Sequence, residues 1–144
     1  MKSKLINDAE QKTYALIFDK GDEVIAGLKE FAQKNDLTAS QFTAIGAFDE
    51  VLLGYFDYAI KDYRKIPIRD QVEVLTLAGD ISLNPDGDVQ VHAHVVVGKA
   101  DGTAHGGHVL SGRVHPTLEV ILTESPAYLR RKQDAETGLA LISV

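Results

Sequence analysis

All five histidines of this 144-residue sequence lie in one stretch, between Val89 and His115. His92 and His94 alternate with apolar residues, and His108 follows two consecutive glycines in the next segment. Imidazole nitrogen is a common ligand of zinc and other transition metals in proteins. The first question is therefore whether these histidines form a metal site, and whether that site does chemistry.

The segment that carries His92 and His94 predicts a β-strand over residues 89–98. Side chains on a strand alternate between its two faces. The odd positions from Val89 to Val97 are all apolar, which predicts one buried face. His92 and His94 then share the opposite face, where two imidazoles can reach one metal ion.

The third ligand depends on the register of the hairpin that follows this strand. If the loop centres on Asp101, paired residue numbers add up to 202, and His94 lies directly opposite His108 on the same face. A two-residue turn at Asp101 and Gly102 would shift the register by one. His108 would then return to that face only through a bulge at the two glycines before it.

A metal site is one interpretation of this pattern, and the predicted ligands are His92, His94 and His108. The alternative is a set of histidines that are hydrogen-bonded at a buried subunit interface. His105 lies near the turn and His115 precedes a proline at a strand end. Neither of these two is predicted to be a ligand.

The elements that position the histidines predict an α+β fold, a mainly antiparallel sheet with one main amphipathic helix packed on it. Apolar residues recur at helical spacing from Val24 to Ala32, with Asp22 as the expected N-cap. Residues 61–70 contain Pro67 and many charges, and predict a loop or an edge strand. Strands are predicted over residues 13–22, 42–47, 51–58, 71–83, 89–98, 107–114 and 118–124. A bulge is predicted at Gly79, and Pro116 is expected to separate the last two strands.

Composition limits the classes of protein that fit this sequence. Hydrophobic residues make up 44% and charged residues 25% of the sequence, as in an ordinary globular domain. A single domain over residues 1–144 is therefore predicted, with its core at about residues 13–142. The formal charge of −6 argues against nucleic-acid binding by this chain alone. The absence of cysteine excludes disulfides and thiolate metal sites. No signal region or apolar run of ~18 residues is found, so a cytoplasmic protein without membrane contact is expected.

The run HAHVVVGKADGTAHGGHVLSGRV resembles the plants-and-prokaryotes conserved (PPC) domain, with its His-x-His strand, Asp-Gly turn and Gly-Gly-His strand. GDEVIAGLKEFAQKNDL, VEVLTLAGDISL and RKQDAETGLALI also match in order, so the resemblance covers about Thr13 to Ile142. It implies a single α+β domain that assembles as a homotrimer. Plant members carry AT-hook peptides that bind DNA, and bacterial stand-alone members are often labelled DNA-binding. This chain has no such hook and no basic tail, so little DNA binding of its own is expected.

The same histidine elements are similar to those of acetolactate decarboxylase, a related fold in which three histidines hold zinc. Carried over residue by residue, these are His92, His94 and His108, although the hairpin here is three residues longer. Such an enzyme also needs acidic and arginine partners. The candidates in this sequence are Glu73, Glu119 and Arg113.

Two functions of different classes remain open, and the sequence does not decide whether the protein is an enzyme. The first is a trimeric module for assembly or regulation, with protein partners, whose histidines hold zinc or line a pocket between subunits. The second is a zinc-dependent lyase or other enzyme acting on an oxo- or hydroxy-acid. There, zinc would polarise a carbonyl or lower the pKa of bound water to ~7, Arg113 would hold a carboxylate, and Glu73 or Glu119 would act as general base.

Overall fold

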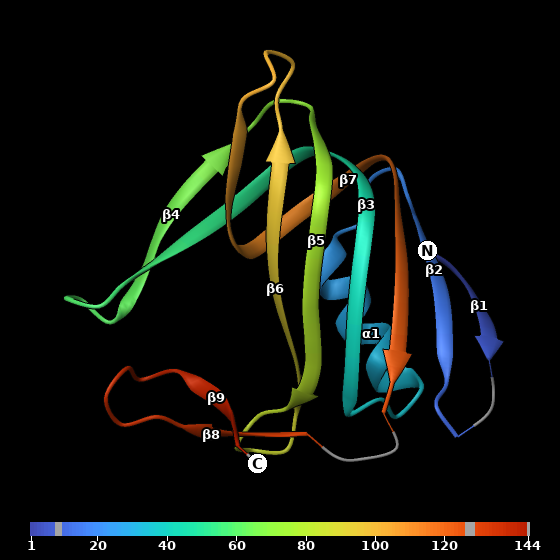
Figure 1. Cartoon of the computed structure of the whole chain (residues 1–144), viewed down its shortest axis with the longest axis vertical. Helices are drawn as coiled ribbons and strands as arrows, with labels where there is room; N and C mark the ends of the chain where they lie inside the picture. The colour runs from blue at the N-terminus through green and yellow to red at the C-terminus, as the bar shows by residue number, and fades with distance from the viewer. Residues whose placement is uncertain (8–9, 126–128, 144) are drawn as a thin grey trace.

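The computed structural model describes residues 1–7, 10–125 and 129–143. In this part of the chain one nine-stranded sheet carries one helix on one of its faces (Figure 1). The elements in chain order are β1 (Lys2–Asn7), β2 (Thr13–Asp19), α1 (Val24–Lys34), β3 (Ala39–Asp57), β4 (Asp62–Ile68), β5 (Val72–Leu83), β6 (Val89–Gly98), β7 (Ala104–Glu124), β8 (Arg130–Gln133) and β9 (Ala140–Ser143). The predicted α+β class is confirmed.

Two long strands organise the sheet. The strand order is β1-β2-β7-β3-β5-β8-β9, with β4 paired to β3, and β6 paired to both β5 and β7. Strands β3, β5, β6 and β7 therefore form a closed circuit of antiparallel pairings. The strand β6, which carries two of the predicted ligands, is held from both sides by this circuit. All pairings are antiparallel except that of β5 with β8.

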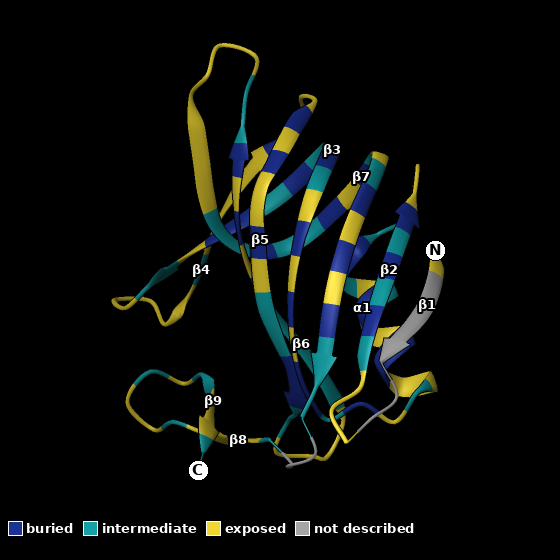
Figure 2. Ribbon diagram, turned by 45° about the vertical axis from the view of Figure 1, so that its right-hand side comes forward, coloured by how far each residue is buried: buried dark blue, intermediate teal, exposed yellow. Residues whose placement is uncertain are grey.

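The core lies between the sheet and the apolar stripe of α1. Val24, Leu28, Phe31 and Ala32 are buried on the helix, as its periodicity predicts. Large fully buried side chains from the strands complete the core, including Phe18, Phe48, Leu77 and Leu118. Figure 2 shows buried and exposed residues alternating along β3 and β7, as expected when one face of a sheet is covered. The described residues include no helix with the length and apolar character that a membrane crossing requires.

The helix begins one residue later than the sequence suggests. Glu23, not Asp22, is the N-cap, and its Oε2 accepts a hydrogen bond from the backbone N–H of Ala26 at 2.6 Å. Asp22 instead accepts from the backbone N–H of Asp19 at 3.0 Å and pairs with the N-terminal amine at 2.9 Å. The carboxylate of Asp22 is thus used to close the turn before the helix, which composition alone does not reveal.

Three further expectations about the strands are wrong. The separate strands predicted over residues 42–47 and 51–58 are one continuous strand, β3. Pro116 does not separate two strands, because β7 runs through it with a cis His115–Pro116 bond. Residues 115–117 of β7 face the single residue Ala47 of β3, so the extra residues are accommodated as an irregularity within the ladder. Gly79 is not a bulge; a Cβ there would lie 2.2 Å from the backbone oxygen of His92, so glycine is needed for close approach of β5 and β6. Residues 62–68 form an edge strand, as one alternative predicted.

Candidate metal centre

The hairpin between β6 and β7 has the register that places three histidines on one face. The backbone N–H of Lys99 donates to the carbonyl of Thr103 at 2.9 Å, and the loop is centred on Asp101. His94 is paired directly with His108, so that paired residue numbers add up to 202. The two-residue turn with a compensating bulge is therefore not what the chain adopts.

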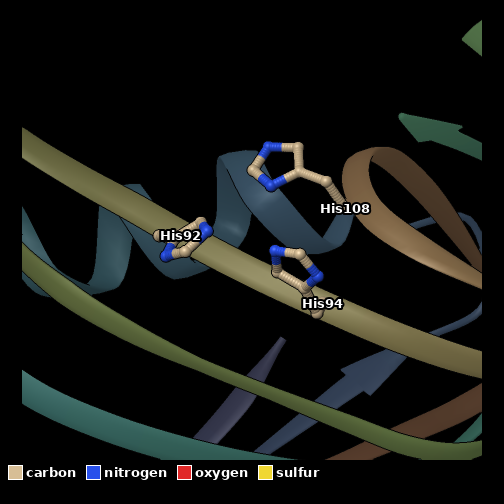
Figure 3. A group of neighbouring side chains, drawn as sticks. All are labelled: His92, His94 and His108. Carbon is tan, nitrogen blue, oxygen red and sulfur yellow. The ribbon is translucent and has the colours of Figure 1, made fainter. Parts of the chain in front are cut away.

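The three imidazoles converge. A nitrogen from each of His92, His94 and His108 lies within 4.8 Å of the others, a separation that one metal ion can bridge. The ring centroids are 5.1 Å apart for His92 and His94, and 5.3 Å for each of the other two pairs. Figure 3 shows a nitrogen of each ring turned toward the space between the rings.

His108 provides the test of whether this cluster fits a metal. Its Nδ1 is buried and has no hydrogen-bond partner among the described residues. A buried polar atom without a partner is costly, and a metal ion would supply the missing interaction. The residues present therefore fit a metal ion held by three nitrogens.

The surroundings keep two of the rings neutral, which is the form that binds metal. Burial lowers the pKa of His108 from 6.5 to about 4, with help from the charges of His92 and His94. Desolvation of its ring also lowers the pKa of His94, although the residue as a whole is exposed, and the charge of His92 contributes less. Ligand histidines must be deprotonated to coordinate, so little proton competition is expected at neutral pH.

Two neighbours of the cluster were not identified from the sequence. Nδ1 of His92 lies 3.3 Å from Oδ2 of Asp80, which faces it across the β5–β6 ladder. Burial raises the pKa of Asp80, but hydrogen bonds from His92 and Arg131 outweigh burial and lower it overall. The ring of Tyr63 stacks on His108, with centroids 4.6 Å apart. Asp80 lies twelve residues before His92, and only the register of the sheet could have revealed the contact.

A cavity of about 510 Å³ opens beside the three histidines. Its wall combines the β3–β4 hairpin with the C-terminal β8–β9 hairpin. The aromatic part consists of Tyr55, Phe56, Tyr58 and Tyr63, and the C-terminal part of Arg131, Leu139, Ala140 and Leu141. The nitrogens of Arg131 donate to Asp80, to Ser82 and to the carbonyl of Ala140. A small molecule could occupy this space next to the imidazoles.

The structure does not bring the other predicted site residues to the histidines. Glu73 and Glu119 line a separate depression on the sheet. Arg113 pairs with Asp49 at 2.7 Å, and its pKa is raised chiefly by that hydrogen bond. None of these three is among the described residues that line the cavity. His105 is paired with Val97, and His115 lies 3.7 Å from Asp49, so neither joins the cluster.

The order of strands and the histidine cluster can now be compared with known proteins. A model of the Plants and Prokaryotes Conserved (PCC) domain, the PPC family, matches residues 6–126. The chain belongs to this family. A PPC protein from Pyrococcus horikoshii is 31% identical, with a TM-score of 0.86 over 99% of this chain and 95% of that one. The metal-containing protein AF0104 from Archaeoglobus fulgidus is 32% identical, with a TM-score of 0.86 over 98% and 99%.

Other PPC-like chains differ in name and length. A protein from Ralstonia eutropha with a provisional DNA-binding name is 26% identical, with a TM-score of 0.85 over 91% of this PPC chain and 90% of that one. Bifunctional protein GlmU from Synechococcus sp. strain JA-3-3Ab is 32% identical over 130 residues, which is 88% of this chain. The chain spans about a fifth of the length of the curated relatives it matches.

The resemblance to acetolactate decarboxylase is one of fold. The enzyme from Bacillus subtilis is 16% identical to this PPC chain, with a TM-score of 0.56 over 88% of this chain and 58% of that one. The related fold predicted from the histidine elements is confirmed. At this level of identity the likeness shows the fold alone.

Proposed function

We propose that this PPC-domain chain is a homotrimeric module that binds zinc through His92, His94 and His108. The observation that carries the proposal is the convergence of the three imidazoles around a buried nitrogen of His108 that has no protein partner. The metal-containing name of the Archaeoglobus relative supports it independently. Three neutral imidazoles leave one position open in tetrahedral zinc coordination.

The test of the metal site is elemental analysis of the untagged protein beside His94→Ala. About one zinc ion per chain is expected in the wild type, and loss of the ion in the variant, because two nitrogens hold zinc far more weakly than three. His105→Ala is the matched control, since His105 lies in the same hairpin but outside the cluster. A wild type that takes up no metal after incubation with zinc would contradict the proposal.

The trimer is supported by the outer face of the sheet, the face turned away from α1 (Figure 2). Large apolar side chains are exposed there on four adjacent strands. They are Ile45 at 60%, Leu75 at 55%, Ile121 at 49% and Val96 at 38% of their full accessible area. Apolar residues gathered on one face of a sheet are typical of an interface between subunits. The match to one fifth of a longer bifunctional protein is in keeping with a module that works with protein partners.

A second candidate function is an enzyme of the lyase type on an oxo- or hydroxy-acid. The cavity of about 510 Å³ beside the histidines favours it, because a substrate there would meet the open position of the metal. Zinc in such a site lowers the pKa of bound water to ~7 and polarises carbonyl groups. Turnover of an oxo-acid by the zinc-loaded protein, absent in His94→Ala with the same oligomeric state, is the result this function requires. No turnover across a broad panel of such acids would contradict it.

DNA binding by this chain alone is not favoured. Six basic side chains are each paired with a carboxylate in the described residues, namely Lys2, Arg64, Arg69, Lys99, Arg113 and Arg131. A trimer would carry a formal charge of −18 (3 × −6). Specific contacts to phosphates need free Lys and Arg side chains, so no DNA binding is expected at physiological salt.

A further inference from the structure

The C-terminal hairpin of β8 and β9 is attached to the rest of the molecule in an unusual way. Figure 1 shows it beside the end of β5, and within the described part of the chain one residue pair, Leu83 with Arg130, joins it to the sheet ladder. Such sparse backbone pairing predicts weak docking. The neighbouring residue Arg131, however, is only 5% exposed, although it carries a charge.

Arg131 is the anchor that holds this hairpin. Its Nε donates to Oγ of Ser82 at 2.7 Å, its Nη1 donates to the carbonyl of Ala140 at 2.9 Å, and its Nη2 pairs with Oδ1 of Asp80. A buried guanidinium is tolerated only when its donors are satisfied, and here two partners come from β5 and one from β9. The hairpin therefore depends on Asp80 and Ser82 for its position.

The same Asp80 carboxylate faces the metal cluster with its other oxygen. Oδ2 lies 3.3 Å from Nδ1 of His92, and a carboxylate can only accept, so the imidazole N–H donates. A histidine that donates from Nδ1 presents the lone pair of Nε2. Contacts of this kind fix the tautomer and the ring orientation of metal ligands.

We propose that Asp80 is a positioning residue for His92, and that Arg131 links the C-terminal hairpin to the metal site through Asp80. The inference rests on the proposed zinc site and adds a regulatory contact to it. Coupling between two binding events is reciprocal. Docking of the hairpin therefore raises zinc affinity, and zinc binding in turn strengthens docking of the hairpin.

The experiment compares wild type with Asp80→Asn, Arg131→Gln and the double variant. Zinc affinity is measured by competition with a chromophoric chelator. Each single variant is expected to bind zinc about tenfold more weakly or worse, the usual effect of losing a partner of a ligand histidine. The double variant is expected to lose less than the product of the two single effects, because both act through one chain of contacts. Lys132→Gln, an exposed neighbour on β8, is the matched control and should bind as wild type does.

Two readouts separate positioning from a general loss of stability. Long-range ¹H–¹⁵N spectra of the metal-free protein should show His92 protonated at Nδ1 in the wild type and in Lys132→Gln, and a changed tautomer population in Asp80→Asn. Amide hydrogen exchange in residues 130–143 should slow on addition of zinc in the wild type and not in Arg131→Gln. If Asp80→Asn fails to fold, the zinc affinity and hydrogen exchange of Arg131→Gln still test the link.

The failures of the two proposals are distinguishable. If the wild type and Lys132→Gln bind zinc while Asp80→Asn and Arg131→Gln bind it equally well, the link is wrong and the zinc site stands. Unchanged exchange of the hairpin on zinc addition to the wild type would also overturn the link. If the wild type binds no zinc at all, the zinc site itself is wrong, and the link fails with it.

Discussion

His108 shows how a residue that is costly to the metal-free protein can suit the proposed metal site. Its ring lies between His92, His94 and the stacked ring of Tyr63, and its Nδ1 has no protein partner. Burial there penalises the charged imidazolium, which is why the pKa falls to about 4. The same burial keeps the nitrogen free for a metal ion at neutral pH.

This pKa makes the stability of the metal-free protein depend on pH in a defined window. The unfolded chain protonates His108 near pH 6.5, but the folded chain does so only near pH 4. The unfolded state therefore binds more protons between these values, so the free energy of unfolding is highest above pH 6.5 and falls as the pH drops toward 4. The loss is at most about 3 kcal/mol, since one pKa unit corresponds to about 1.4 kcal/mol.

Urea unfolding of the metal-free wild type and of His108→Gln, at several pH values across this window, measures the effect. The free energy of unfolding of the wild type should fall relative to that of His108→Gln as the pH drops through this window, because only the wild type carries the buried imidazole. His105→Gln should run parallel to the wild type. A constant difference between wild type and His108→Gln would show that the burial of this ring does not govern its protonation.

At the residue scale, the clustering of the three histidines could be predicted from the sequence, but the residues that contact them could not. Alternation along β6 places His92 and His94 on one face, and an Asp101-centred loop brings His108 opposite His94. Both arguments use only local spacing. Asp80 and Arg131 reach the site through β5 and a distant hairpin, and nothing in their local sequence marks them. Glu73, Glu119 and Arg113 had the right chemistry, but the sheet places them elsewhere.

At the element scale, periodicity predicted the helix and most strands because each has one buried face. The errors fall where tertiary contacts decide the local conformation. Asp22 is a good capping residue by type, yet Glu23 caps the helix because its longer side chain also reaches β7. Pro116 usually interrupts a ladder, yet β7 continues, because Gly46 and Leu118 pair on the far side of the irregularity.

The double contact of Glu23 predicts how the helix is fastened to the sheet. Its Oε2 accepts from Ala26 at the start of α1, and its Oε1 accepts from the backbone N–H of Gly112 in β7 at 2.9 Å. Glu23→Ala removes the cap and leaves both donors without this partner, which should lower the free energy of unfolding by about 1–2 kcal/mol. Chemical denaturation measures this loss. Glu30→Ala, an exposed position on the same helix, is the control, and equal losses in both variants would refute the double role.

On the scale of the whole molecule, the two faces of the sheet have different coverings. One face is covered by α1, and the other exposes Ile45, Leu75, Val96 and Ile121. His94 is exposed on this second face and borders the same depression as Val96. A partner subunit on the outer face would therefore lie close to the histidine cluster. The sequence alone could not reveal this apolar surface. Strand alternation predicts which residues of one strand are exposed, but not which strands lie side by side in the sheet.

Ile121→Glu and Ile45→Glu test whether this outer face is the trimer interface. A glutamate buried there would lose its hydration without gaining a partner, which costs several kcal/mol per subunit contact. The wild type should sediment as a trimer at micromolar concentration, and both variants should shift toward monomer while circular dichroism stays unchanged. Ile60→Glu, equally exposed at 62% but in the turn between β3 and β4, should remain trimeric. A monomeric wild type would refute the trimer, whereas a trimer that survives both substitutions would place the interface on another surface and leave the apolar face for a different protein partner.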